Sequence, residues 1–324
     1  MSDDSRWMDA AAALGARGRG NSAPNPNVGC VIVAAGRVAG EGWTQAGGRP
    51  HAEQMALDQA GANAAGATAF VTLEPCCHVS PRGPACADLL VAAKVSRVVA
   101  ALRDPDPRVD GGGFARLRAA GIAVTIGIGA EQAARSMAGF LTRRRLGRPS
   151  VTLKLAMSID GRIALPSGES RWITGEDARA DAHRERAQAD MILVGRGTWE
   201  ADAPRLDVRL PGLEHRSPRR ALLTRGAAVD GWTRLGSPQD VFDLGDVNDL
   251  LIEGGAATAA AFLRADLVDR LLVYRAPLLI GAGKPSVGDI GLTALADAHG
   301  RWRLSETRPL GIDRLEVYER VREP

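Results

Sequence analysis

Short apolar runs alternate with stretches of helical spacing along the first half of the chain. The predicted strands are the apolar runs at 28–36, 67–75, 96–102 and 122–128. The predicted helices, in which apolar residues recur at helical spacing, are 51–64, 86–95 and 112–121. Strands that alternate with helices indicate a layered α/β domain.

An arginine-rich segment, LTRRRLGRPS at 141–150, follows a further helical stretch. Its adjacent arginines and its proline are typical of a solvated linker, and we favour this interpretation over a nucleic-acid-binding patch. The sequence therefore predicts two domains, 1–146 and 147–324.

The α/β pattern starts again after this segment. Residues 150–165 predict two strands joined by a turn at Asp160–Gly161, and 174–190 predict a charged helix with Thr174 as its N-cap. The remaining elements predicted are a strand that enters a glycine turn at 191–198, a strand, Gly-Gly turn and helix at 248–266, and closing strands at 269–281 and 313–321. The second half is therefore a second α/β domain.

Composition agrees with a globular protein of two domains. The chain has 324 residues, of which 45% are hydrophobic and 24% charged, and each half is long enough to bury its own core. A net charge of +3 gives no indication of nucleic-acid binding. The acidic N-terminus is no signal peptide, and no apolar run approaches the roughly 18 residues of a membrane span. Four unevenly spaced cysteines do not form a disulfide framework, so we expect a cytoplasmic protein.

Metal-type ligands gather in the first domain. His51-Ala52-Glu53, Pro75-Cys76 and Cys86 supply one imidazole and two thiolates, which leave the fourth position of a tetrahedral zinc ion for water. Zinc nucleobase deaminases show this pattern, with the glutamate as proton shuttle. Zinc lowers the pKa of its water to about 7, and Glu53 then takes the proton and delivers it to the departing amine. The sequence therefore predicts a hydrolytic deaminase.

Two neighbours of these ligands could compete with them. Nine residues (77 to 85) separate Cys76 from Cys86, which excludes the compact P-C-x-x-C form of the motif. Cys77 and His78 are alternative ligands, but we favour a packed thiol for Cys77 and a substrate contact for His78. Cys30 is expected in the core. Both ligand cysteines are expected at or near helix starts, where the helix dipole favours a thiolate.

The motifs of both halves resemble, in order, those of the bifunctional deaminase–reductase family of riboflavin biosynthesis. The deaminase half contains NPNVGCVIV, HAEQMAL, VTLEPCCH, PACADLL and DPDPRVDGGGFARLRAAGI. The reductase half contains TLKLAMSIDGRIA, SGESRWITGEDARADAHRERAQADMILVGRGT, ADAPRLDVR and LIEGGAATAAAFL. The resemblance spans nearly the whole chain. It implies a cytidine-deaminase-like three-layer α/β/α domain followed by a dihydrofolate-reductase-like α/β domain.

The resemblance also implies two reactions, two cofactors and the kind of partner. A diamino-pyrimidinone that carries a ribosylamino 5-phosphate is deaminated with one zinc ion per chain, and NADPH then reduces the opened ribose to ribityl. The partner is thus a small phosphorylated pyrimidine, with neither nucleic acid nor membrane expected. A homo-oligomer formed through the reductase domain is also implied.

Site residues follow from the resemblance by position. Those implied to bind substrate are Asn25, His78, Ser170, Arg186, Leu206, Arg209 and Glu253. Those implied to bind the reductase cofactor are Ala156, Trp172, Thr198, Asp202, Gly254 and Gly255. Arginines such as Arg186 and Arg209 can hold a phosphate as a fork, and a Gly-Gly turn before a helix lets backbone N–H groups approach an anion. A plain strand-to-helix turn is the alternative for the glycines.

The chain departs from the family pattern in two loops. His78 is followed by VSPRGPAC, which is one residue longer than the common HGRTPPC. ALLTRGAAVDGW lacks the usual Asp-Ser or Asp-Thr, which leaves a cofactor contact near Thr224 or Arg225 open, and 226–249 is short. A nucleic-acid deaminase is disfavoured because aromatic residues make up only 4% of the chain, and a pseudo-enzyme because both motif sets are intact.

Overall fold

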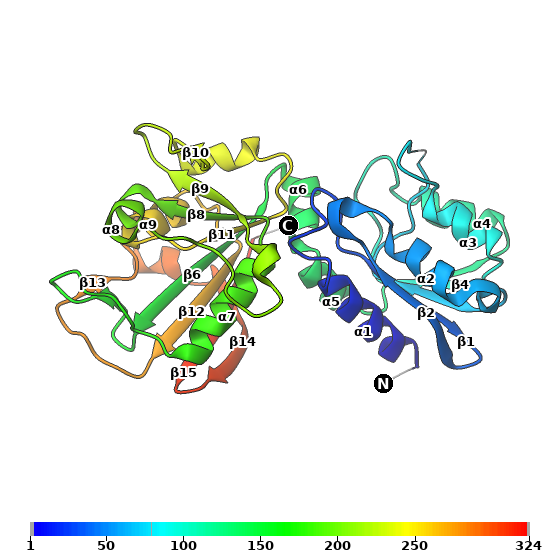
Figure 1. Cartoon of the computed structure of the whole chain (residues 1–324), viewed down its shortest axis with the longest axis horizontal. Helices are drawn as coiled ribbons and strands as arrows, with labels where there is room; N and C mark the ends of the chain where they lie inside the picture. The colour runs from blue at the N-terminus through cyan, green and yellow to red at the C-terminus, as the bar shows by residue number, and fades with distance from the viewer. Residues whose placement is uncertain (1–2, 79, 323–324) are drawn as a thin grey trace. The chain divides into compact units, whose positions relative to one another are not determined.

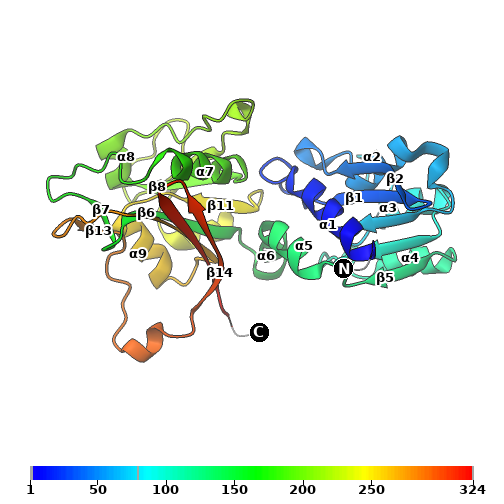
Figure 2. The same cartoon turned by 90° about the horizontal axis from the view of Figure 1, so that it is seen from below.

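The computed structural model describes residues 3–78 and 80–322, and the chain divides into two compact units, Met1–Gly147 and Arg148–Pro324 (Figures 1 and 2). Each unit is an α/β domain, as predicted. Within the described residues, no helix combines the length and the apolar character that a membrane crossing requires.

The first unit places a sheet between two layers of helices. Its sheet has the order β2-β1-β3-β4-β5, with β1 antiparallel to both neighbours and β3, β4 and β5 parallel. The strands are β1 (Gly29–Ala34), β2 (Arg37–Trp43), β3 (Thr68–Val71), β4 (Arg97–Ala100) and β5 (Ala123–Ile126). The helices are α1 (Asp3–Ala16), α2 (Ala52–Ala60), α3 (Cys86–Ala92), α4 (Gly112–Ala119), α5 (Ala130–Ser136) and α6 (Ala138–Leu146), with short 3-10 turns at Ala46–Gly48 and Gly61–Ala64. Figure 1 shows α1 and α5 on one side of this sheet and α2, α3 and α4 on the other.

Glycines on β2 bring α2 unusually close to the sheet. A Cβ atom on Gly40 would lie 2.0 Å from the carbonyl oxygen of Ala56, and one on Gly42 would lie 2.4 Å from that of Ala52. No larger residue fits at either position without moving the helix. This contact fixes the first turn of α2, which begins immediately after His51 and contains Glu53.

The second unit is built on a mixed sheet in the order β10-β9-β8-β11-β6-β12-β15-β14. Its elements are β6 (Ser150–Ser158), β7 (Arg162–Ala164), α7 (Glu176–Ala187), β8 (Met191–Gly195), α8 (Arg196–Asp202), β9 (Arg219–Leu223), β10 (Thr233–Leu235), β11 (Asp249–Ile252), α9 (Ala256–Arg264), β12 (Arg270–Ala276), β13 (Lys284–Pro285), β14 (Trp302–Leu310) and β15 (Asp313–Arg320), with 3-10 turns at Glu214–Arg216, Pro238–Asp243 and Leu295–Ala298. The strands from β10 to β12 are parallel, and β15 and β14 add antiparallel pairs. The carboxyl ends of the parallel strands meet at one edge, where ligands of open α/β sheets bind.

Three local predictions were wrong. Thr174 does not cap α7: its N-cap is Gly175, whose N–H donates to Asp313 Oδ2 at 2.7 Å. The expected glycine turn after β8 is the helix α8, which begins directly at Arg196. The arginine-rich segment contains the boundary between the two units and is partly exposed, but it is no irregular linker, because most of it forms the end of α6. The structure also contains α1, β2, β9, β10 and β14, which the apolar pattern did not reveal.

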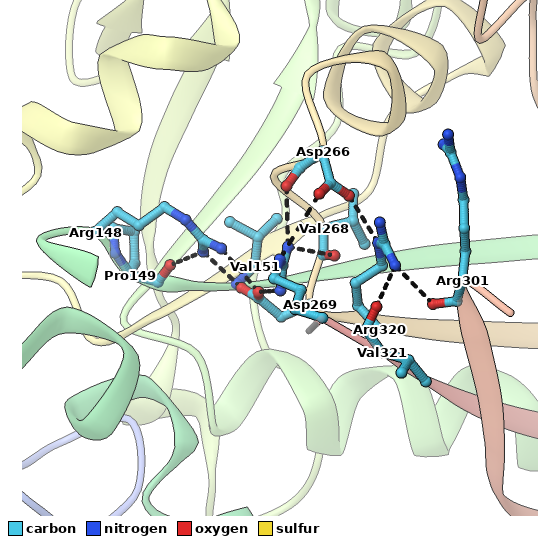
Figure 3. A network of polar contacts seen from close by, with 10 residues as sticks. Arg148, Pro149, Val151, Asp266, Val268, Asp269, Arg301, Arg320 and Val321 are labelled. Carbon is cyan, nitrogen blue, oxygen red and sulfur yellow. Dashed lines mark hydrogen bonds and ion pairs between the residues drawn. The ribbon is translucent and has the colours of Figure 1, made fainter. Parts of the chain in front are cut away.

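A polar network closes the start of the second unit (Figure 3). Asp269 accepts hydrogen bonds from Arg148 Nη1 at 2.7 Å and Nη2 at 2.9 Å, and from the Val151 N–H at 2.8 Å. Arg322 Nη1 donates to the same carboxylate, so Asp269 joins both ends of the unit. The Arg148 side chain is only 4% exposed. Removing one partner of a buried pair is costly, so Arg148 belongs structurally to the second unit.

Two candidate active sites

The predicted zinc ligands come from three separate segments of the first unit. His51 is the N-cap of α2, and Cys86 is the first residue of α3. Cys76 lies in an irregular loop after β3, so the expectation of a helix start holds for Cys86 only. The loop is nevertheless tied to α3, because the Cys86 N–H donates to Cys76 Sγ at 3.3 Å.

The ligand atoms of these residues converge on one point. His51 Nδ1 lies 3.2 Å from Cys86 Sγ and 3.6 Å from Cys76 Sγ, and the three ligand atoms lie within 4.8 Å of one another. Tetrahedral zinc with ordinary Zn–N and Zn–S bonds would separate N from S by about 3.5 Å and the two S atoms by about 3.8 Å. One imidazole and two thiols in this arrangement fit zinc without rebuilding of the backbone.

The pKa values of the two thiols are shifted in opposite directions. Hydrogen bonds from Cys86 and His51 lower the pKa of Cys76 to about 4, although burial opposes this shift. The pKa of Cys86 is raised by its contact with Cys76 and by burial. The lowered pKa of Cys76 suits a cation ligand, and a zinc ion held by the pair would favour the thiolate form of both cysteines.

Cys77 points away from this cluster. Its Sγ lies 3.7 Å from the carbonyl oxygen of Arg108 and 4.0 Å from that of Val109. Within the described residues, the cluster of metal-type ligands contains His51, Cys76 and Cys86 but not Cys77. Cys30 is fully buried on β1, as expected.

Glu53 lies beside the ligands with its carboxylate buried. Its side chain lines the same cavity as His51 and Cys76, and the residue is 3% exposed. Burial raises the pKa of Glu53, against the opposing effect of the His51 charge. A carboxylate with a raised pKa is a better proton acceptor at neutral pH, which suits a proton shuttle.

The cavity in front of the cluster has a volume of about 220 Å³. Two residues implied to bind substrate, Asn25 and His78, line it. Asn25 approaches the backbone so closely that a Cβ on Gly48 would lie 1.7 Å from its Nδ2. Among the described residues, His78 Nδ1 is buried without a hydrogen-bond partner, which makes it available to a ligand.

Several lining residues were not predicted from the sequence. They are charged side chains from three loops and from α6: Arg49, Arg82, Asp104, Asp106, Arg108 and Arg144. Arg144 pairs with Asp106 at 2.9 Å, so the end of α6 contributes to this cavity. Burial raises the pKa of Asp104 to about 6, whereas hydrogen bonds from Arg108 lower that of Asp106 to about 2. The DPDP motif was the only sequence signal for the two aspartates.

Glu74 has a structural role beside the ligands. Its carboxylate accepts hydrogen bonds from the backbone N–H groups of Asp104, Gly111 and Phe114, at 3.3, 3.0 and 3.1 Å. These bonds hold the 104–114 segment, which contributes Asp104 and Asp106 to the cavity, against the loop that carries Cys76. Glu74 therefore shapes the cavity through the backbone.

The second candidate site centres on Glu253, at the carboxyl end of β11. Arg186 Nε and Nη2 donate to Glu253 Oε1 and Oε2 at 2.7 and 2.9 Å, and Lys154 Nζ lies 3.5 Å from Oε2. Burial alone would raise the pKa of Glu253, but Lys154 and Arg186 lower it to about 2. Lys154, which lies on β6, was not predicted as a site residue, because no motif near it in the chain indicates a functional role.

Arg186 does not present an open fork to a phosphate in this structure. Two of its nitrogens are bound to Glu253, and Nη1 donates to the Asp207 carbonyl oxygen at 3.0 Å. Arg209 is exposed, and its Nε lies 3.6 Å from Asp207 Oδ1. Leu206 is buried in the core, so its side chain offers little surface to a ligand. Of the two arginines, Arg209 is therefore the one whose side chain is exposed.

The residues implied to hold the reductase cofactor lie in two neighbouring places. The Gly255 N–H donates to Thr198 Oγ1 at 3.1 Å, which joins the Gly-Gly turn before α9 to α8. Trp172 is 66% exposed and stacks on Arg179, whose guanidinium carbon lies 4.8 Å from the ring centroid.

The other implied positions surround these two places. Asp202 Oδ1 lies 3.7 Å from Arg171 Nη2. Arg171 belongs to the same loop as Trp172 and Ser170. Ala156 is on β6, opposite Tyr274 of β12. The structure thus distributes the implied cofactor residues over the ends of β6, β8 and β11 and the 165–175 loop.

Comparison with known proteins matches each half of the chain to a family. Residues 1–102 match the cytidine and deoxycytidylate deaminase zinc-binding region, and 149–314 match the RibD C-terminal domain. The riboflavin biosynthesis protein RibD of Haemophilus influenzae is 39% identical over 96% of both chains.

Two solved structures resemble the whole chain. Acinetobacter baumannii RibD is 37% identical with a TM-score of 0.87 and covers 99% of both chains. A diaminohydroxyphosphoribosylaminopyrimidine deaminase/5-amino-6-(5-phosphoribosylamino)uracil reductase of Thermotoga maritima is 28% identical, with a TM-score of 0.88 over 98% of this chain and 99% of that one.

Proposed function

The chain belongs to the RibD family of riboflavin-biosynthesis proteins, and on this premise we propose the substrates and the residue roles of its two reactions. It is a bifunctional enzyme of riboflavin biosynthesis, with a zinc-binding deaminase domain and a reductase domain. The observation that carries the assignment of the first reaction is the convergence of His51, Cys76 and Cys86 beside the buried Glu53.

The first reaction is hydrolytic deamination of a diamino-pyrimidinone that carries a ribosylamino 5′-phosphate. His51, Cys76 and Cys86 hold the zinc ion, which polarises the attacking water when it is bound. Glu53 takes the proton of that water and delivers it to the amine, which leaves as ammonia. Asn25 and His78 orient the pyrimidine ring in the cavity.

The second reaction reduces the ribosyl group of the deaminated product to ribityl. NADPH supplies the hydride when it is bound near Ala156, Trp172, Thr198, Asp202 and the Gly254–Gly255 turn. Glu253 and Ser170 contact the substrate, with Arg209 toward its phosphate. Arg186 and Lys154 keep Glu253 ionised and in place, because both cations lie against its carboxylate.

A two-step assay tests this function on the full chain. Ammonia release from the diamino substrate should precede the oxidation of NADPH, and substrate that is already deaminated should oxidise NADPH at once. Ammonia release without NADPH oxidation would leave a deaminase with an inactive second unit. Absence of both reactions would contradict the function.

The two reactions should also be separable into the pieces 1–147 and 148–324. Each piece keeps its own sheet and core, so the first should release ammonia and the second should oxidise NADPH. The second piece must begin at Arg148, because this residue binds Asp269 (Figure 3). A matched piece that begins at Ser150 should unfold at a lower temperature. Inactivity of both pieces in their own reactions would contradict the division.

We also propose that the second unit forms a homo-oligomer. The support is exposed apolar surface near the edge strand β14, where Leu304 and Ile312 are 53% and 78% exposed. Exposed apolar residues at a sheet edge favour association with another chain. Light scattering of the purified 148–324 piece should give more than the monomer mass, and a monomer at micromolar concentration would contradict the proposal.

A further inference from the structure

The 206–209 segment, which carries Arg209, belongs to no strand or helix. Leu206 and Val208 are buried and the residues that alternate with them are more exposed, so the segment lies over the core with one face outward. Leu206 has a φ of 56°, in the left-handed region that a leucine rarely adopts. Such a conformation persists only where the surrounding structure holds it. Other side chains must therefore fix the shape of this segment.

Two side chains hold the middle of the segment. Arg186 Nη1 donates to the Asp207 carbonyl oxygen at 3.0 Å. The Val208 N–H donates to Ser217 Oγ at 2.9 Å. This hydroxyl in turn donates to the Glu214 carbonyl oxygen at 2.8 Å, so its own direction is fixed. Two consecutive residues of the segment are thus each bound through their backbone.

His183 holds the end of the segment. It lies on α7, three residues before Arg186, and its Nδ1 accepts a hydrogen bond from the Arg209 N–H at 3.3 Å. Only a neutral imidazole with its proton on Nε2 offers a lone pair at Nδ1. The Arg209 side chain is held less firmly, since its Nε lies 3.6 Å from Asp207 Oδ1, beyond hydrogen-bond distance. The placement of this guanidinium therefore depends on the backbone that His183 holds.

The surroundings of His183 favour its neutral ring. The charged groups that face it are Arg186 on α7, Glu253 after β11, and Asp207 and Arg209 in the segment. Partial burial lowers the pKa of His183, and the two arginines lower it further against the opposing effect of the two carboxylates. A proton on Nδ1 would turn this atom into a donor that faces another donor, the Arg209 N–H. Protonation would therefore break the bond.

We infer that His183 is a positioning residue for the phosphate of the reductase substrate, and that it acts only as a neutral imidazole. This inference rests on the proposed contact of Arg209 with that phosphate. The ring holds in place the backbone from which the guanidinium extends, which lowers the cost of ordering this group when the substrate binds. Because the phosphate is remote from the carbon that receives the hydride, the effect falls on KM rather than on kcat.

Two substitutions separate the hydrogen bond from the bulk of the ring, in the reduction of already deaminated substrate by the full chain. His183→Leu removes the acceptor and should raise KM about 2- to 10-fold at about pH 8, the usual contribution of one hydrogen bond, with kcat little changed. His183→Asn brings its Oδ1 close to the position of Nδ1 and should keep the wild-type KM. His215→Asn changes an exposed histidine of the same unit and should alter neither constant.

The pH profile of KM distinguishes positioning from a merely structural role. Wild-type KM should rise above that of His183→Asn as the pH falls toward about 5, because only the imidazole acquires a proton. The substrate phosphate, with a second pKa of about 6, titrates equally in both assays and cancels in their ratio. Parallel profiles would overturn the inference. So would a wild-type KM that falls below that of the variant, because an imidazolium would then bind the phosphate itself.

Ser217→Ala tests the same segment at a second position, should His183→Leu fail to fold. It frees the Val208 N–H and should raise KM for the phosphorylated substrate but not for the dephosphorylated one. An unchanged KM in both variants, an equal rise for both substrates, or a loss of kcat alone would overturn the positioning role and leave the reductase function intact. Wild type that oxidises no NADPH with the deaminated substrate would instead contradict the proposed function.

Discussion

Glu53→Gln should lower the rate of ammonia release by about 100- to 10,000-fold, the usual contribution of general acid–base catalysis. The amide has nearly the size of the carboxylate but cannot accept the proton of the attacking water. Zinc should stay bound at the wild-type level, because the ligand cluster consists of His51, Cys76 and Cys86. Ammonia release and metal content, measured on the same preparation, check both expectations.

The second reaction serves as the internal control for this variant. Reduction of already deaminated substrate should keep its wild-type rate, since the residues proposed for it begin beyond Arg148. The diamino substrate should consequently accumulate without oxidation of NADPH. Ammonia release above about a tenth of the wild-type rate would show that another group carries the proton. His78, which lines the same cavity, would be the first candidate.

The zinc ligands could be predicted from the sequence because each belongs to a short motif. His51 and Glu53 are two residues apart at the start of a helix, and the backbone of Cys86 binds the sulfur of Cys76. These relations join residues that are close together in the chain, so the sequence alone could indicate them. The family resemblance supplied what the motifs could not, namely the second reaction and its cofactor.

The rest of the first cavity depends on contacts between distant segments. The sequence predicts that Arg144 is part of a linker, because its neighbours in the chain are arginines and a glycine. In the structure it lies on α6 and pairs with Asp106. Asp106 in turn belongs to a segment that Glu74 holds in place through backbone hydrogen bonds. No periodicity in the chain encodes such pairings, so these lining residues appear only in the folded structure.

The second site shows the same limit for side-chain pairing. The sequence places Arg186 on a charged helix and Glu253 before a Gly-Gly turn, but not their bidentate ion pair. Because this pair uses the fork of Arg186, we propose that Arg209 makes the phosphate contact that the resemblance implies for both arginines. The polarity of the residues was predictable, whereas the choice of partner depends on the parallel order of the sheet.

Cys76→Ser and Cys86→Ser should each lose zinc and nearly all deaminase activity, whereas Cys77→Ser should keep both. A serine hydroxyl is a much poorer zinc ligand than a thiolate, and two protein ligands would remain. Changes to groups that only support a ligand cost about 10- to 100-fold, so loss of a ligand should cost more than about 100-fold. Cys77 is the matched control, because it adjoins Cys76 but directs its sulfur toward the Arg108 carbonyl oxygen.

Elemental analysis of protein purified without chelators measures the outcome. Wild type and Cys77→Ser should contain one zinc ion per chain, and the other two variants close to none. Treating wild type with a chelator should abolish ammonia release and spare the reduction of deaminated substrate, because the ligands all belong to the first unit. Zinc that disappears from Cys77→Ser but persists in Cys76→Ser would show that the adjacent thiol is the ligand. Ammonia release at full rate by metal-free wild-type enzyme would show that the reaction does not require zinc.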